Sequence, residues 1–446
     1  MKKKVGVVSL GCPKNLVDTE IMLGILNGDE FETTNNEDEA QIIIINTCGF
    51  IESAKKESIE TILEMAKYKS SNCELLIVTG CLAERYKEDI LNEIPEVDAV
   101  AGVGNYEEIA EIISEAYKGI KVAKYGKLSE KAYLENKRVL STKNGFAYLK
   151  IAEGCDNCCT YCIIPKLRGS YRSRLIEDIV KEAAWLAEAG VKEVILVAQD
   201  TTRYGSDIYK EKKLVELIHK VSQIDGIESI RLLYCYPEEI DEALINELAN
   251  NDKLCKYIDI PIQHISDSVL KMMGRRTTSK DIEDLLVKLR ERVPGIILRT
   301  SLIVGFPGET QEDFEKLFNF VNDFSFDRMG VFIYSKEEGT PAAKLKIQIP
   351  KRIKEIRQKK LLVLQNEISR KKNTERLGKV YKTLVEGVAE DGIFYYGRCY
   401  AEAPDIDGLI YFTSREPIAI GNYVIVKILD IDDYDLIGEV IDESAE

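Results

Sequence analysis

The chain has 446 residues, of which 45% are hydrophobic, and a formal net charge of −15 at pH 7. This length exceeds what one hydrophobic core usually serves, so two or three domains are expected. No uncharged apolar run approaches the roughly 20 residues of a membrane helix, and the negative charge disfavours general nucleic-acid binding. The apolar run from Val5 to Leu10 is too short for a signal sequence. We therefore expect a soluble, cytoplasmic protein with no membrane segment.

Cysteine and histidine usage narrows the possible chemistry. The sequence contains 11 cysteines but only two histidines, His219 and His264. An odd number of cysteines without a secretion signal disfavours a disulfide framework and favours metal or redox chemistry. Two histidines leave little room for a histidine-based zinc or acid–base site. We assign no catalytic acid or base.

Apolar runs alternate with helical stretches between residues 3 and 126. Three of these runs, 5–10, 40–45 and 75–78, are each followed closely by one cysteine, namely Cys12, Cys48 and Cys81. Such runs are typical of a parallel sheet buried on both faces. The carboxyl ends of its strands share one edge, where ligands bind. We therefore expect the three cysteines to converge, although 36 and 33 residues separate them (48 − 12 and 81 − 48). The alternative is three buried cysteines that only pack.

Six further apolar runs, each followed by a polar or helical stretch, occupy the middle of the chain. The expected strands are 146–151, 193–198, 229–234, 257–262, 296–304 and 328–334, and the expected helices are 176–189, 212–221, 238–250, 279–292 and 311–324. Successive βα units of this kind predict a parallel barrel or part of one, with the active site at the carboxyl ends of the strands. Residues at or near those ends are candidate cofactor contacts, or ordinary polar residues of a barrel mouth: Gln199, Asp200, Arg299, Ser301 and Gly305.

The first of these units carries four cysteines within eight residues, Cys155, Cys158, Cys159 and Cys162. Read through Cys159, the spacing is C-x3-C-x2-C. Three thiolates on one loop can hold three irons of a [4Fe–4S] cluster and leave the fourth iron open to a small molecule. Spacing alone leaves the register through Cys158 open. Zinc is the weaker interpretation, because the extra cysteines crowd the single C-x2-C pair.

The C-terminal part changes character twice. Residues 344–382 are basic with an apolar stripe, which predicts a long helix whose charges form a solvated face rather than an RNA contact. Five short runs, 379–388, 393–400, 409–413, 423–431 and 436–441, then predict a small antiparallel β-barrel of OB-like type. Residues 386–446 carry 15 acidic and three basic side chains, a net charge of 3 − 15 = −12. Such a barrel would attract a basic protein, unless the acidity only aids solubility.

The C-x3-C-x2-C motif after the first barrel strand resembles the radical S-adenosylmethionine (SAM) enzymes. With the N-terminal cysteines and the C-terminal barrel added, nearly the whole chain resembles the methylthiotransferases. The resemblance implies an α/β N-terminal domain at 3–126, a radical SAM partial barrel at 141–372 and a TRAM-like barrel at 375–442. It also implies SAM and two [4Fe–4S] clusters. Cys155, Cys159 and Cys162 would hold the radical-generating cluster, and Cys12, Cys48 and Cys81 a second cluster that delivers sulfur.

Two branches of that family differ in their substrate. One modifies adenosine in transfer RNA and commonly has Tyr-Gly-Cys-Gln-Met-Asn at the first cysteine. The segments Ser9–Asn15, Asn46–Ile51 and Gln199–Gly205 resemble the other branch, which modifies an aspartate in the twelfth protein of the small ribosomal subunit. That resemblance implies a basic ribosomal protein as partner and an electron donor such as flavodoxin or ferredoxin. The charge of the C-terminal segment agrees independently, because an acidic barrel suits a basic protein better than RNA. An alternative of another class is a non-enzymatic iron–sulfur scaffold or ribosome-assembly factor.

Overall fold

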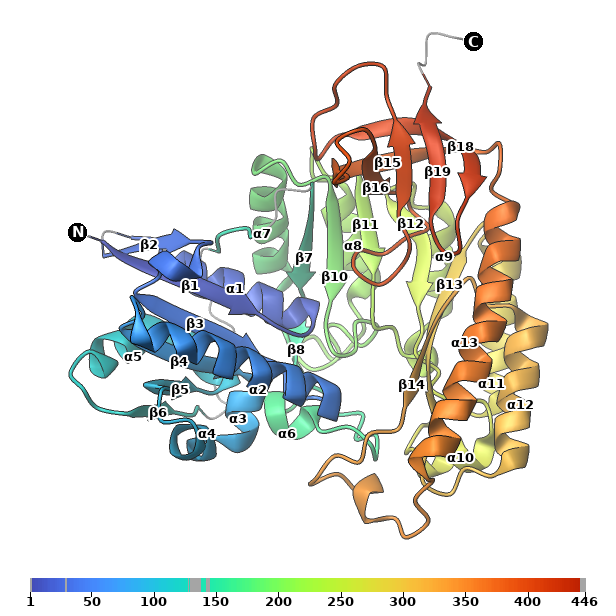
Figure 1. Cartoon of the computed structure of the whole chain (residues 1–446). Coiled ribbons are helices and arrows are strands. Elements are labelled where there is room, and N and C mark those ends of the chain that lie inside the picture. The colour runs from blue at the N-terminus through green and yellow to red at the C-terminus, as the bar shows by residue number, and fades with distance from the viewer. Residues whose placement is uncertain (1, 29, 127, 129–137, 142–144, 442–446) are drawn as a thin grey trace. The chain divides into compact units, whose positions relative to one another are not determined.

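The computed structural model describes residues 2–28, 30–126, 128, 138–141 and 145–441 (Figure 1). The chain divides into two compact units. The first combines Met1–Ser141, Ala152–Arg174 and Ser335–Ala343, and the second combines Thr142–Ile151, Leu175–Tyr334 and Lys344–Glu446. The loop with four cysteines therefore belongs to the same unit as the N-terminal segment. Two parts of the predicted domains lie outside the described residues. They are residues 142–144, near the start of the predicted barrel segment 141–372, and residue 442, at the end of the predicted C-terminal domain 375–442.

The first unit contains a six-stranded sheet whose neighbouring strands are all parallel, in the order β2-β1-β3-β4-β5-β6. The strands are β1 (Lys3–Ser9), β2 (Phe31–Thr34), β3 (Ile42–Thr47), β4 (Leu75–Gly80), β5 (Ala99–Ala101) and β6 (Val122–Lys124). The parallel sheet and three of its strands were predicted. β2, β5 and β6 were not predicted, because each has only three or four residues and none is a continuous run of large apolar side chains.

Helices cover both faces of this sheet. They are α1 (Pro13–Leu26), α2 (Glu52–Ala66), α3 (Cys81–Tyr86), α4 (Glu88–Glu93) and α5 (Ile109–Ala116). Ile42 and Ile44 pack in one apolar cluster with α1 and α5, whereas Ile43 and Ile45 pack in another with α2 and α3. Successive side chains of one strand point to opposite faces. A strand covered on both sides is therefore apolar throughout, as the sequence of β3 is.

The second unit contains a second parallel sheet of six strands, in the order β14-β13-β12-β11-β10-β7. Its strands are β7 (Phe146–Lys150), β10 (Glu193–Val197), β11 (Ser229–Leu232), β12 (Leu254–Asp259), β13 (Ile297–Val304) and β14 (Arg328–Ile333). The helices are α7 (Ile176–Glu188), α8 (Leu214–Ser222), α9 (Glu242–Asn250), α10 (Asp267–Met272), α11 (Ser279–Arg292) and α12 (Gln311–Phe324). The six βα units were predicted, and the sheet is open, as expected of a partial barrel.

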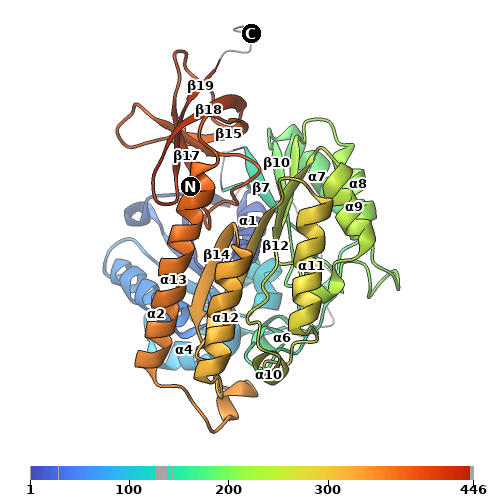
Figure 2. The same cartoon turned by 90° about the vertical axis from the view of Figure 1, so that its right-hand side faces the viewer.

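The long helix α13 (Lys351–Thr374) packs beside α12 in this unit (Figure 2). It leads into a closed barrel of five strands, β15 (Val380–Val388), β16 (Tyr395–Arg398), β17 (Ile410–Thr413), β18 (Tyr423–Ile431) and β19 (Leu436–Val440). Four of its pairings are antiparallel, and the β17–β19 pairing is parallel. The closed barrel was predicted, but its strands are not all antiparallel.

Buried ion pairs join this small barrel to the parallel sheet of the same unit. Arg398 of β16 contacts the carboxylate of Glu193 on β10 at 2.8 Å. Glu402 contacts Arg328 of β14 at 3.0 Å and also pairs with Arg376. Burial alone would raise the pKa of Glu402, but the two guanidinium groups outweigh it and lower that pKa to about 2. Part of the acidity counted in the sequence is therefore neutralised inside the molecule.

Of the helices that the structure describes, none is long and apolar enough to cross a membrane.

Candidate functional site

Three cysteines follow three neighbouring strands of the N-terminal sheet. In the sheet order, β1, β3 and β4 are adjacent. Cys12 caps the start of α1 after β1, Cys48 directly follows β3, and Cys81 directly follows β4 as the first residue of α3. The structure therefore brings these cysteines to one edge of the sheet. We call them the sheet-edge cysteines.

Two glycines let the cysteine loops approach one another closely. A Cβ atom on Gly11 would lie 2.8 Å from Cβ and 3.1 Å from Sγ of Cys48. A Cβ atom on Gly49 would lie 2.8 Å from the main-chain oxygen of Cys81. Because contacts under 3.0 Å are too short for a real Cβ atom, any other residue at these positions would push the loops apart.

The side chain of Asn15, on the first turn of α1, contacts all three loops. Its Nδ2 donates to the main-chain oxygens of Leu10 at 2.9 Å and Thr47 at 3.1 Å, just before Cys12 and Cys48. Its Oδ1 accepts from Sγ of Cys81 at 3.9 Å. The sequence reasoning assigned no role to Asn15. Its place three residues after a cysteine, next to a predicted strand end, was the available signal.

Arg168 reaches the same place from the other cysteine loop. It ends α6 (Ile164–Arg168), which begins two residues after Cys162, and only 1% of its surface is exposed. Its Nη1 donates to Glu153 at 2.9 Å and to Asp18 at 3.1 Å, and its Nη2 donates to Oδ1 of Asn15. One buried guanidinium therefore links the two groups of cysteines within the first unit. No sequence signal pointed to this residue.

Apolar packing reinforces that link. Cys81 packs in one buried cluster with Val103 of the N-terminal segment and with Ile163 and Leu167 of the four-cysteine segment. The short helices α3 and α6 are in contact. The position of Cys81 thus depends on both parts of the first unit.

Burial and mutual proximity disfavour free thiolates at the sheet edge. Burial, followed by the neighbouring Cys81, raises the pKa of Cys48 to about 12. Burial also raises the pKa of Cys81, and the positive charge of Arg168 opposes this increase. Buried thiols of this kind become thiolates when a bound metal supplies the compensating charge. Their chemistry therefore fits a metal centre.

The four-cysteine loop is closed at its base by the short antiparallel pair β8 (Ala152–Glu153) and β9 (Arg172–Ser173). Cys155 and Cys159 are buried and Cys162 is partly buried, whereas Cys158 is exposed. The backbone of Cys158 has a φ of 53°, in the left-handed region that few non-glycine residues adopt. Burial, followed by Cys159, Cys155 and Cys158, raises the pKa of Cys162. Cys158 thus differs from the other three in exposure and backbone conformation.

Neither group of cysteines resembles a site for a single ion. Among the described residues, no three His, Cys, Asp or Glu side chains gather closely enough to hold one metal ion. In a [4Fe–4S] cluster each thiolate binds a different iron, so the ligands are separated by the cluster itself. Sets of three cysteines without histidine therefore fit an iron–sulfur cluster better than a zinc ion.

The predicted cofactor contacts lie in the second unit. Gln199 and Asp200 follow β10, and buried Asp200 accepts a hydrogen bond from Thr202 at 2.7 Å. Gly305 directly follows β13, with a φ of 70°, and a Cβ atom there would lie 2.3 Å from Cγ of Lys354. This glycine leaves room for the side chain of Lys354. The sequence did not predict that contact.

The other two predicted contacts, Arg299 and Ser301, lie within β13. Nη1 of Arg299 donates to Asp259 at 2.8 Å, and its Nε lies 3.6 Å from Asp407 of the small barrel. Tyr257 donates to the same Asp407 at 2.7 Å. Arg299 is therefore already engaged by two carboxylates.

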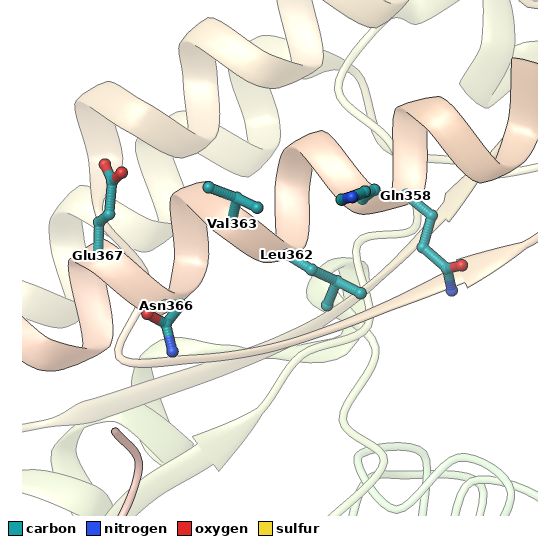
Figure 3. A pocket seen from close by; sticks show the side chains of 6 residues that line it. Gln358, Leu362, Val363, Asn366 and Glu367 are labelled. Carbon is teal, nitrogen blue, oxygen red and sulfur yellow. The ribbon is translucent and has the colours of Figure 1, made fainter. Parts of the chain in front are cut away.

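A surface hollow of about 380 Å³ lies along α13 (Figure 3). It is lined by Gln358, Lys359, Leu362, Val363, Asn366 and Glu367. None of the predicted site residues lines it. Its lining residues include no cysteine or histidine, so we do not associate it with the cysteine chemistry.

Three family models match successive parts of the chain. Residues 4–102 match the Uncharacterized protein family UPF0004, residues 149–321 match the Radical SAM superfamily, and residues 377–441 match the TRAM domain. These matches follow the same order as the two parallel sheets and the small barrel.

Three similar proteins carry the name ribosomal protein uS12 methylthiotransferase RimO. The protein from Acetivibrio thermocellus is 65% identical over 452 residues, and the match covers 100% of this chain and 100% of that protein. Those from Clostridium botulinum strain Eklund 17B and Clostridium tetani are 54% and 52% identical, over 100% of this chain and 99% of theirs.

Solved structures share the fold at low sequence identity. The radical SAM methyltransferase TsrM from Kitasatospora setae, with cobalamin and a [4Fe–4S] cluster bound, has a TM-score of 0.58 at 16% identity, over 77% of each chain. The cobalamin-dependent radical SAM enzyme OxsB has a TM-score of 0.51 at 15% identity, over 83% of this chain and 56% of its own.

Proposed function

Because the chain belongs to the family of the ribosomal protein uS12 methylthiotransferases, we propose that it transfers a methylthio group to the β-carbon of an aspartate in uS12. It is a radical SAM transferase whose cofactors are SAM and [4Fe–4S] clusters. The high similarity to the Acetivibrio thermocellus protein along the whole length carries this proposal. The motif around Cys12, which differs from that of the transfer-RNA branch, agrees with it.

Two clusters would be held by separate sets of cysteines in the first unit. Cys155, Cys159 and Cys162 would hold the radical-generating cluster, and the sheet-edge cysteines Cys12, Cys48 and Cys81 would hold the second. When bound, the first cluster and SAM supply the 5′-deoxyadenosyl radical that removes a hydrogen atom from the substrate carbon. The burial of Cys159 and the exposure of Cys158 support this choice of register.

Each of the three segments, 3–126, 141–372 and 375–442, would then have a separate binding role. The first would hold the sulfur-donating cluster, the second would bind SAM, and the third would bind the substrate protein. Five residues would line the SAM site: Gln199 and Asp200, which follow β10, Arg299 and Ser301, which lie within β13, and Gly305, which follows β13.

Exposed acidic residues support binding of a basic protein by the C-terminal barrel. Glu386 and Glu402 do not contribute, since buried arginines pair with both. Three aspartates are exposed where β18 turns into β19: Asp430 near the end of β18, and Asp432 and Asp433 in the connection to β19. We call these three residues the acidic hairpin. A patch of one sign on the surface steers a partner of opposite charge. The proposal also includes a cytoplasmic location and a flavodoxin or ferredoxin as electron donor.

Mass spectrometry of uS12 from a deletion strain tests the substrate. We expect uS12 to lose the mass increment of one methylthio group in the deletion strain and to regain it when the gene is restored. Methylthiolated adenosine in transfer RNA from the same cells serves as the control and should not change. Loss of the modification from transfer RNA, with uS12 unchanged, would contradict the proposal and favour the other branch.

Variants C158A and C159A test the register of the four-cysteine loop. Each is combined with C12A, C48A and C81A, so that iron can bind only at that loop. After anaerobic reconstitution, C158A should keep about four irons per chain and C159A should lose them. The reverse result would show that Cys158 is the ligand.

A further inference from the structure

The side chains of Asn15 and Arg168 meet between the two groups of cysteines. We propose that they are positioning residues for the second cluster: Asn15 fixes the spacing of the three cysteine loops, and Arg168 sets the reduction potential of the cluster that they hold. This inference rests on the proposed assignment of Cys12, Cys48 and Cys81 as its ligands.

Asn15 is suited to hold three loops at once. It is 1% exposed, and its amide nitrogen donates to the main-chain oxygens of Leu10 and Thr47. The bond to Thr47 is buried, so water does not satisfy that oxygen. Its amide oxygen faces Arg168 and Sγ of Cys81. An additional bond, from Nδ2 of Asn46 to the main-chain oxygen of Asn15 at 2.8 Å, fixes the residue itself. A primary amide offers two donors and an acceptor in one plane, which neither a carboxylate nor an alkyl group can replace.

Arg168 controls the charge beside the cysteines. It lies against two carboxylates, Asp18 at 3.1 Å and Glu153 at 2.9 Å, so the three groups carry a net charge of 1 − 2 = −1. Loss of the guanidinium would remove one positive charge from this buried group. The reduced cluster carries one more negative charge than the oxidised one, and nearby charges and hydrogen bonds set its potential. Loss of Arg168 should therefore make reduction harder.

Arg168 also has the geometry that lysine lacks. The planar guanidinium donates along separate directions to Asp18, Glu153 and Asn15. An ammonium group supplies the same charge from a single point. The conservative variant R168K therefore separates the effect of charge from the effect of hydrogen-bond geometry.

The experiment uses the full chain with C155A, C159A and C162A, so that iron can bind only at the sheet-edge cysteines. Into this parent we introduce N15D, R168Q or R168K. The matched control is K118Q, which removes one exposed positive charge from the same unit. Circular dichroism reports folding, iron analysis reports occupancy, and redox titration followed by electron paramagnetic resonance reports the midpoint potential.

We expect the parent and K118Q to bind about four irons with the same potential. R168Q should lower the midpoint potential by at least about 59 mV, which corresponds to a tenfold change in the one-electron equilibrium constant. R168K should lower it by less. N15D, which has the same shape, should fold and lose iron, because it removes both donors to the loop carbonyls. N15D decides the outcome if R168Q fails to fold.

Two results would overturn the inference, and they are distinguishable. If the parent binds a cluster but N15D and R168Q keep its occupancy and potential, the pair has no positioning role although the ligands are correctly assigned. If the parent binds no cluster, the assignment of Cys12, Cys48 and Cys81 is wrong, and the inference falls with it.

Discussion

The guanidinium of Arg85, on α3, lies 2.7 Å from the carboxylate of Glu337, which is 252 residues further along the chain. Glu337 is 2% exposed and also accepts from Nζ of Lys55 at 2.9 Å. Arg85 donates to the main-chain oxygen of Gly49 at 2.9 Å, next to Cys48. The segment after β14 thereby supports the helix that starts at Cys81 and the loop that carries Cys48.

Replacing Glu337 should destabilise the first unit strongly. The variant E337A leaves the buried side chain of Arg85 without its main partner, and removal of one member of a buried pair costs about 3–5 kcal/mol. The neighbouring Glu338 is 67% exposed in its contact with Arg85, so E338A should cost about 1 kcal/mol or less. Urea denaturation followed by circular dichroism measures both. Equal losses would show that Glu337 has no special structural role.

Gly80 should be required for metal binding at the sheet edge. Its φ is +94°, and a Cβ atom there would lie 2.3 Å from Oδ1 of Asn46 and 2.5 Å from the main-chain oxygen of Thr47. Since Cys81 is the next residue, G80A should displace it and lower the iron content of a chain that carries only the sheet-edge cysteines. The control is G119A, where φ is +76° but nothing lies within 4 Å of the added atom. Normal iron content in G80A would contradict this expectation.

His264 should make stability depend on pH. Burial is the main reason why its pKa falls from 6.5 to about 4. Between these values the unfolded chain binds a proton that the folded chain does not, so the free energy of unfolding falls as the pH drops from 6.5 to 4. The total contribution is about 3 kcal/mol. Above pH 6.5 and below pH 4 this residue should add no further change.

The variant H264N isolates that contribution, because its side-chain oxygen can still accept the 2.9 Å hydrogen bond from the main chain of Ser266. Urea denaturation between pH 4 and pH 7 should show a weaker pH dependence for H264N than for the wild type. H219N is the control, since His219 is exposed. An unchanged pH dependence in H264N would exclude His264 as its source.

Neutralising the acidic hairpin should weaken binding of uS12. In the variant D430N/D432N/D433N the asparagines can still accept the local main-chain hydrogen bonds that Asp430 and Asp432 accept. Only the charge is lost, and we expect about a tenfold weaker affinity at low salt and a smaller difference at high salt. Titration calorimetry at two salt concentrations measures both.

The control for the acidic hairpin is E283Q/D284N/E291Q, which removes three exposed charges from α11. It should leave the affinity for uS12 unchanged. If both triple variants weaken binding equally, only the overall charge of the chain matters. The proposed contact with the barrel would then be wrong.

The sequence was informative where periodicity was strong. All six strands of the second sheet were predicted, although β12 begins at Leu254 rather than near Tyr257. Continuous apolar runs such as that of β3 indicated a parallel sheet, and a parallel sheet has all its carboxyl strand ends on one edge. For that reason the meeting of Cys12, Cys48 and Cys81 could be expected before any contact was known.

The contacts that organise the cysteines could not be predicted in the same way. Arg168 pairs with Asp18 across 150 residues, and Arg85 with Glu337 across 252. Such partners follow no local period, and a buried arginine has the same sequence signature as an exposed one. The parallel pairing of β17 with β19 was missed for a related reason, because strand order in a barrel is not encoded in the runs themselves.

The most direct test of the two-cluster account uses purified, anaerobically reconstituted enzyme with SAM, a reductant and uS12. The wild type should form 5′-deoxyadenosine and add one methylthio group to uS12, as seen by mass spectrometry. The variant C12A/C48A/C81A should still form 5′-deoxyadenosine but leave uS12 without the methylthio group. Methylthiolated uS12 from that variant, at the yield of the wild type, would contradict the account.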